Sequence, residues 1–209
     1  MSRRLNALRK QITVLRTQLL PEPFDPLGQY PNASRVQTST RGFLVLSHAE
    51  VESFVEGWAK DIARSAERVW SSSGRISPPL SFLLATSEQR LEPAESLANA
   101  DGDSHSRLGR LVTAVFTKHY RLINNNHGIK EKNMLALFDP VGIPESAFGP
   151  SLLPELNTLG SMRGKHAHYS AATVESVLDP ETEFNRLTRV VTELAVLDTY
   201  LFNYKRRIR

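Results

Sequence analysis

Hydrophobic residues recur every three or four positions along most of the chain, and this spacing predicts α-helices. The first helix is expected over residues 3–19, the second over 42–70 and the third over 106–126. A fourth helix leads into the segment 156–170, and a fifth begins after Asp179. No useful length of chain alternates apolar and polar residues as a half-buried strand does. The pattern therefore predicts an all-α fold, a helical bundle of four to five main helices.

The segments between these helices carry residues that interrupt regular structure. Three prolines between positions 21 and 26 follow the first helix, so residues 1–40 are expected to form an N-terminal helix and an irregular arm. Residues 80–104 join a short apolar patch to an acidic, small-residue stretch, and are expected to form a long mobile loop between the second and third helices. We expect a single helical domain spanning residues 1–209 with this long insertion.

The start of the fifth helix carries the clearest local signal. Asp179 is placed to cap the helix, and Pro180 suits its first turn. Glu181 and Glu183 follow where negative charge favours the positive end of the helix dipole. Between the third and fourth helices, residues 129–150 are expected to form a connector with short helical pieces.

Composition excludes several kinds of site and of protein. The chain of 209 residues has 40% hydrophobic residues, enough for a well-buried domain, and no cysteine. The absence of cysteine excludes disulfides and thiolate zinc sites and fits a cytoplasmic location. No stretch is apolar enough to span a bilayer, and no apolar run after Arg3 and Arg4 marks a secretory signal, so no membrane partner is expected.

Charge is concentrated at the two ends of the chain. The formal net charge is +4, residues 1–20 contain five basic side chains and no acid, and the sequence ends in Lys205-Arg-Arg-Ile-Arg209. Basic ends favour a polyanion such as RNA as a partner, although such ends also serve only to keep a protein soluble.

The segment Leu156–Ser170 holds the candidate chemistry. An apolar helical stripe ends at Arg163, and Lys165, His166, His168 and Tyr169 follow within six positions. Arginine keeps its charge at any physiological pH, whereas histidine titrates near neutrality. Together they supply what metal-independent phosphodiester cleavage requires, and we take Arg163 and His168 as the candidate catalytic pair.

Other interpretations of these residue types remain open. Arginine also precedes histidine at Arg41 and His48 and at Arg121 and His127, so the spacing alone is weak evidence. Cations at a helix C-terminus also complement the helix dipole, which makes a solvated helix end the simplest alternative. His166 and His168 are two residues apart and do not share a helical face, which argues against a zinc site. His48 and Glu52, four residues apart, are typical of a surface or capping pair but could line a polar groove.

Helix geometry sets a condition on the candidate pair. Positions five apart on an ideal helix lie about 140° apart around its axis. Arg163 and His168 therefore meet on one phosphate only if the helix loosens after Gly164 or if two chains contribute to the site. Arg163 and His166, three apart, share a face without distortion.

The segment from Leu156 to Tyr169 resembles the signature of the HEPN superfamily, in which an apolar helix leads into an Arg followed by four residues and a His. Arg163, Ala167 and His168 match in register, while Gly164 stands where a polar residue is usual and Tyr169 where glycine is frequent. Residues 46–54 and 126–133 are similar to segments of one HEPN branch associated with ribonucleases and defence systems.

The resemblance implies a homodimer that brings two Arg–His motifs into one cleft and cleaves RNA without a metal or other cofactor. His168 would act as general acid or base, Arg163 would stabilise the charged transition state, and a 2′,3′-cyclic phosphate would form. Lys165, His166 and Tyr169 would contact the substrate. A toxin or defence effector of this kind would also have an antitoxin or other regulatory protein as a partner.

Two alternatives belong to other functional classes. Because some HEPN proteins are non-catalytic, the chain could be a dimerisation module that binds RNA, a nucleotide or a protein. It could also be a helical adaptor with no role in nucleic-acid binding.

Overall fold

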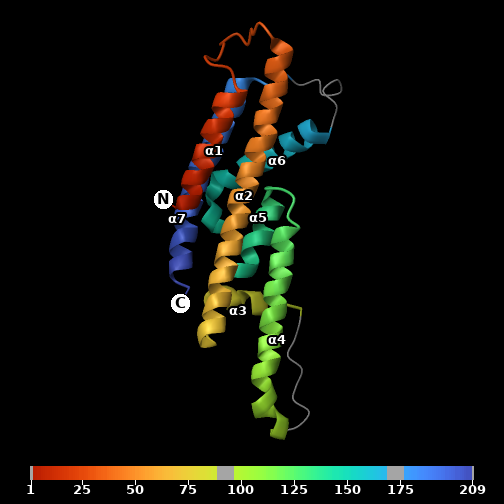
Figure 1. The fold of residues 1–209 in the computed structure, drawn as a ribbon, viewed down its shortest axis with the longest axis vertical. Helices are drawn as coiled ribbons and strands as arrows, with labels where there is room; N and C mark the ends of the chain where they lie inside the picture. The colour runs from red at the N-terminus through yellow and green to blue at the C-terminus, as the bar shows by residue number, and fades with distance from the viewer. Residues whose placement is uncertain (1, 89–96, 169–176, 209) are drawn as a thin grey trace. The chain divides into compact units, whose positions relative to one another are not determined.

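The fold is described from a computed structural model, which covers residues 2–88, 97–168 and 177–208, with the side chains of 97–106 and 166–168 left aside. All regular structure in these ranges is helical, which confirms the all-α prediction (Figure 1). The elements are α1 (Arg3–Leu19), α2 (Ala33–Ser73), α3 (Pro78–Ala85), α4 (Leu97–Asn124), α5 (Glu131–Phe138), the 3₁₀ turns η1 (Asp139–Val141) and η2 (Glu145–Phe148), α6 (Gly149–His168) and α7 (Pro180–Arg206). In the described ranges, no helix is long and apolar enough to cross a membrane.

The helices group into two compact units. The first, here called unit 1, contains residues 1–55, 127–134 and 145–202, and the second, unit 2, contains 56–126, 135–144 and 203–209. The long helix α2 and the C-terminal helix α7 each contribute to both units, because the division falls within them. The expectation of a single domain over residues 1–209 stays a prediction.

Helix α2 begins nine residues before the predicted start at Gly42, so the predicted irregular arm extending to residue 40 is wrong in its last part. The physical reason is a cap at Asn32, whose side-chain oxygen accepts the backbone N–H of Arg35 at 3.0 Å. The first turns of α2 are polar and mostly exposed, so they lack the apolar spacing from which the helix was predicted.

The predicted loop over residues 80–104 is also wrong at both ends. Its apolar start belongs to α3, which buries Leu80 and Leu83, and its last residues belong to α4. Residues 89–96 lie outside the described part of the chain. The short connector helices predicted between 129 and 150 are confirmed by α5, η1 and η2.

The start of α7 is as the sequence predicts. Asp179 accepts the backbone N–H of Thr182 at 2.8 Å and the Thr182 hydroxyl at 2.6 Å. Just before the cap, the Gln37 side chain of α2 pairs with the backbone of Leu178 through two hydrogen bonds, of 2.7 and 2.9 Å. Helix α7 is therefore held at its first turn by a local cap and by a tertiary contact within unit 1.

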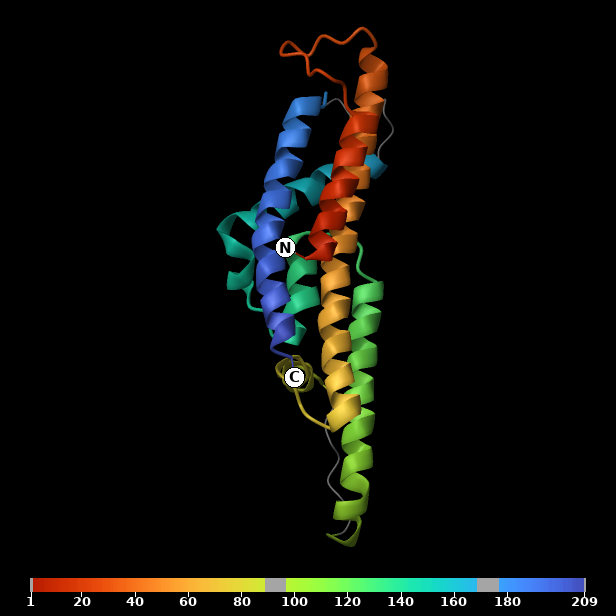
Figure 2. The same ribbon diagram turned by 60° about the vertical axis from the view of Figure 1, so that its left-hand side comes forward.

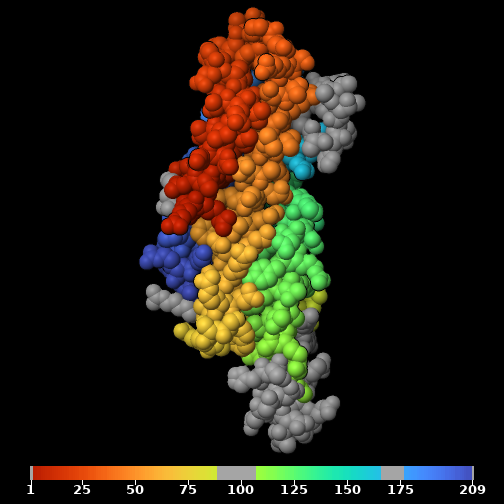
Figure 3. Space-filling view, viewed as in Figure 1, coloured from red at the N-terminus to blue at the C-terminus, as the bar shows by residue number. Residues whose placement is uncertain are grey.

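The helix α1 is fixed to α7 by a buried polar contact in unit 1. Both oxygens of the fully buried Asp198 accept hydrogen bonds from Ser2, one from its backbone N–H at 2.9 Å and one from its hydroxyl. The Ser2 oxygen in turn caps α1 by accepting the N–H of Leu5. In Figure 2 α1 runs beside α2, and Figure 3 shows the outer face of α1. Arg3, Arg9 and Lys10 of this helix are exposed.

Unit 2 is built on the C-terminal half of α2 and on α4. Tyr120 of α4 donates a hydrogen bond to Glu67 of α2 at 2.6 Å. The turn after η1 requires glycine, because Gly142 has a φ of +79° and a Cβ there would overlap the ring of Phe82. The Tyr204 hydroxyl donates to the carbonyl of Val141 at 2.8 Å, which holds the same turn from α7.

Removing the buried carboxylate should destabilise the protein. We expect Asp198→Ala to lower the free energy of unfolding by about 1–3 kcal/mol, because it leaves the buried Ser2 donors without their acceptor. Chemical denaturation measures the change. Thr199→Ala, at the exposed neighbouring position, is the control and should change the value by less than about 0.5 kcal/mol. Equal stability of the two variants would contradict the role given to Asp198.

Candidate functional site

The apolar stripe of α6 determines where Arg163 lies. Its buried residues are Leu152, Leu153, Leu156 and Leu159. Arg163 follows Leu159 by four positions and Leu156 by seven, which places it on the same side of the helix. The Arg163 side chain is accordingly half-buried, whereas Lys165, on the opposite side, is exposed.

His48 of α2 and Arg163 of α6 both belong to unit 1. His48 is only 2% exposed. Burial is the main cause that lowers the pKa of His48 to about 4, and the positive charge of Arg163 lowers it further. The imidazole is therefore neutral at pH 7, and the two residues interact electrostatically.

The interpretation of His48 and Glu52 as a surface or capping pair is wrong. His48 follows Leu44 by four positions and precedes Val51 and Val55 by three and seven, so it belongs to the buried side of α2. Its Nδ1 lies 3.9 Å from the Glu52 carboxylate. Because the imidazole is neutral at pH 7, this approach is a weak polar contact and not a salt bridge.

The described part of the chain brings together some of the predicted site residues. Arg163 and Lys165 lie on α6, and the helix continues without a break through Gly164 to His168. The loosening of the helix after Gly164 is therefore not observed, and positions 163 and 168 stay about 140° apart around the axis. The side chains of His166 and His168, and the whole of Tyr169, lie outside the described residues.

A second basic side chain, that of Lys130, packs against α6, and no sequence pattern singled it out. The stem of Lys130, which precedes α5, crosses the backbone of Gly160 so closely that a Cβ there would lie 2.9 Å from its Cγ. The start of α5 is fixed to α6 as well, because Asn157 accepts the backbone N–H of Glu131 at 2.9 Å and donates to its carboxylate at 3.2 Å. These contacts place Lys130 less than one turn from Arg163 along α6.

Arg163 has no ion pair among the described residues of unit 1. In the described residues, no carboxylate lies within 4.0 Å of the Arg163 guanidinium, so its charge is not neutralised by an ion pair there. Exposed positive charge comes from Lys165 of α6 and from Lys130, whose stem packs against α6. Among the described side chains, no group of three His, Asp or Glu residues could hold a metal ion.

In comparisons with known proteins, no protein family, no curated protein and no solved structure matches this chain. The resemblance to the HEPN superfamily, and the function that it implies, stay predictions. The fold and the contacts of α6 are the observations on which a function can be argued.

Arg163→Ala should raise the pKa of His48. The substitution removes a positive charge that disfavours the protonated imidazole, while burial still keeps the pKa below the usual 6.5. The imidazole resonances of His48, followed by NMR as a function of pH, measure the shift. Lys165→Ala, which removes an exposed charge on the opposite side of α6, should leave this pKa unchanged. An unchanged pKa in Arg163→Ala would contradict the electrostatic interaction of the two groups.

Proposed function

We propose that this protein is a metal-independent endoribonuclease whose site is built on the C-terminal half of α6. The observation that carries the proposal is the arrangement of α6 in unit 1. The segments 46–54, 126–133 and 156–169 are far apart in the sequence, yet Asn157 of α6 is hydrogen-bonded to Glu131 of the second, and the charge of Arg163 lowers the pKa of His48 in the first. These are the segments that resemble HEPN proteins, so the resemblance extends over residues that are joined in space.

In this proposal Arg163 binds the scissile phosphate. Its guanidinium presents several donors in a fixed plane and suits a phosphate that gains charge in the transition state. A half-buried position strengthens this interaction, because less water competes for the charge. Lys130 holds a flanking phosphate beside Arg163, and Lys165, three positions from His168 on the other side of α6, holds one beside that residue. His166 and Tyr169 add contacts to phosphate or base.

His168 is the proposed proton-transfer group. It takes the proton of the ribose 2′-hydroxyl, whose oxygen forms a bond to the adjacent phosphorus. The bond from phosphorus to the 5′-oxygen of the next nucleotide breaks, and that oxygen takes a proton from water. The products are a 2′,3′-cyclic phosphate and a 5′-hydroxyl. His48 cannot replace His168 in this role, because it is buried and its pKa is about 4.

The continuity of α6 favours a site made by two chains. Since positions 163 and 168 are about 140° apart on an unbroken helix, one copy does not direct both side chains at the same phosphate. We propose that Arg163 of one copy and His168 of a second copy act on one phosphate in a homodimer. A regulatory protein, as an antitoxin would be, could then inhibit the enzyme by covering this cleft.

The first test is cleavage of a mixed RNA by the purified protein in the presence of EDTA. We expect wild-type protein to leave cyclic-phosphate ends. Arg163→Ala should lose about 10²–10³ in rate, and His168→Ala about 10²–10⁴. Arg163→Lys tests the planar guanidinium and should also be impaired. Lys132→Ala, which removes an exposed charge of α5, is the control and should cleave as wild type.

Three outcomes would contradict this proposal. Full activity of His168→Ala would remove the proposed acid–base group. No cleavage by any variant, together with RNA binding that weakens steeply with salt, would favour the alternative of a non-catalytic RNA-binding module. No cleavage and no salt-dependent binding would favour an adaptor without a nucleic-acid role.

The second test mixes two inactive variants. If each site takes Arg163 from one chain and His168 from the other, a dimer of Arg163→Ala with His168→Ala contains one intact site. Random pairing makes half of the dimers mixed, so equal amounts should recover about a quarter of the wild-type rate after subunit exchange. A mixture as inactive as its components, with mixed dimers confirmed by mass spectrometry, would place both groups in one chain.

A further inference from the structure

A cavity of about 190 Å³ lies within unit 2, between α3, α4 and η1. Helix α4 forms one wall with Val115, Lys118, His119 and Leu122, which recur at the spacing of one helix face. Leu83 and Pro140 close the cavity from the other elements. None of these residues belongs to the proposed ribonuclease site.

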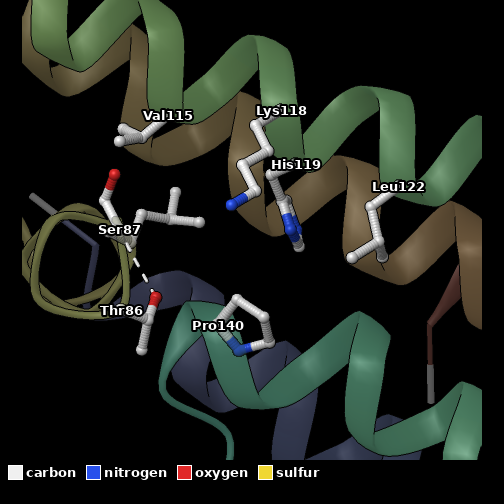
Figure 4. A pocket seen from close by; sticks show the side chains of 8 residues that line it. Thr86, Ser87, Val115, Lys118, His119, Leu122 and Pro140 are labelled. Carbon is white, nitrogen blue, oxygen red and sulfur yellow. Dashed lines mark hydrogen bonds between the residues drawn. The ribbon is translucent and has the colours of Figure 1, made fainter. Parts of the chain in front are cut away.

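The cavity combines an apolar body with two nitrogen groups. Figure 4 shows His119 and Lys118 pointing from α4 into the space bounded by Pro140. His119 is only 3% exposed, and its Nε2 is buried without a hydrogen-bond partner. A buried polar atom of this kind costs free energy until a partner reaches it, so it marks where a ligand atom gains most.

Lys118 places a positive charge at the opening of the cavity. Its side chain is 63% exposed and lies 3.6 Å from the Glu88 carboxylate, which is itself 92% exposed. An ion pair as exposed as this contributes little, so a ligand carboxylate could replace that of Glu88 at small cost. Thr86 donates its hydroxyl proton to the carbonyl of Phe82 at 2.8 Å and therefore has no proton left for a ligand.

The size of the cavity limits the ligand. A cavity of about 150 Å³ lined by apolar side chains is large enough to hold benzene. The cavity here is slightly larger, so a single six-membered ring with one small substituent fits, and a nucleotide does not. The apolar walls from Leu83, Val115, Leu122 and Pro140 suit the ring.

We propose that unit 2 binds a small monocyclic aromatic carboxylate, with the ring against the apolar walls and the carboxylate between His119 Nε2 and Lys118 Nζ. In the neutral imidazole the Nε2–H tautomer donates to the carboxylate. Burial lowers the pKa of His119 to about 4, so the imidazole is neutral at pH 7. A bound carboxylate favours the protonated ring and should raise that pKa.

The test titrates the full-length protein with benzoate at pH 7 and follows the His119 imidazole resonances by NMR. A ligand of this size should bind with a dissociation constant between about 10 µM and 1 mM. Bound benzoate should shift the His119 resonances and raise its pKa. Benzylamine, which has the same ring and a positive charge, and acetate, which has no ring, should bind at least about tenfold more weakly.

Two substitutions test the apolar part of the cavity and the charge of Lys118 separately. Val115→Phe fills the cavity and should abolish binding, whereas Lys118→Gln removes an exposed charge without affecting folding and should weaken benzoate about three- to tenfold. Arg121→Gln, an exposed position of α4 outside the cavity, is the matched control and should bind as wild type.

Three results would overturn the proposal: no shift of His119 with benzoate, equal binding of benzylamine, or unchanged affinity in Lys118→Gln. The first would mean that the cavity holds water only.

Discussion

The burial of the leucine stripe on α6 is the constraint on which the candidate site depends. Turning this helix about its axis would bring leucines such as Leu152 and Leu156 into water, at a cost of about 1.5–3 kcal/mol for each side chain. The rotation of α6 is therefore set by hydrophobic burial. Arg163 is half-buried as a consequence of that rotation, without any ion pair to hold it among the described residues.

A partly buried cation costs the folded chain free energy but favours the binding of an anion. The Arg163 side chain is partly buried, which costs free energy for a charged group. The leucine stripe and the Asn157 contact to α5 fix the helix that carries this charge. A positive group on a helix fixed by packing needs less reorganisation when an anion binds. This combination favours a binding or catalytic site over a solvated helix end, where the same charge would be free to move.

Local sequence signals predicted those elements that local interactions determine. The bounds of α1 and the cap of α7 follow from apolar spacing and from Asp179, and both agree with the structure. The start of α2 was missed because its first turns are polar and its signal is the lone cap Asn32. The loop predicted over 80–104 was wrong because acidic and small residues were taken as a sign of irregular chain, although the stretch from Leu97 is helical.

The candidate site likewise combines features that the sequence predicts with features that only the packing of the fold determines. The sequence indicated that Arg163 continues an apolar stripe, and the spacing of His48 from Leu44 and Val51 carried a burial signal that was not used. The electrostatic effect of Arg163 on His48 acts between two helices more than a hundred residues apart in the sequence, and no spacing rule reports such an interaction. Lys130 was missed for the same reason, since only the packing of its stem on Gly160 brings it to α6.

The two buried histidines affect how any dependence of activity on pH must be interpreted. His48 in unit 1 and His119 in unit 2 both have a pKa near 4 in the folded chain, against 6.5 when exposed. The unfolded chain therefore takes up these protons first as the pH falls, and stability decreases between about pH 6.5 and 4, by at most about 1.4 kcal/mol per pH unit for each histidine. General acid–base catalysis by an exposed histidine depends on pH in the same range. A loss of cleavage below pH 6 therefore reports on His168 only if the free energy of unfolding, measured at the same pH, shows that the fold is intact.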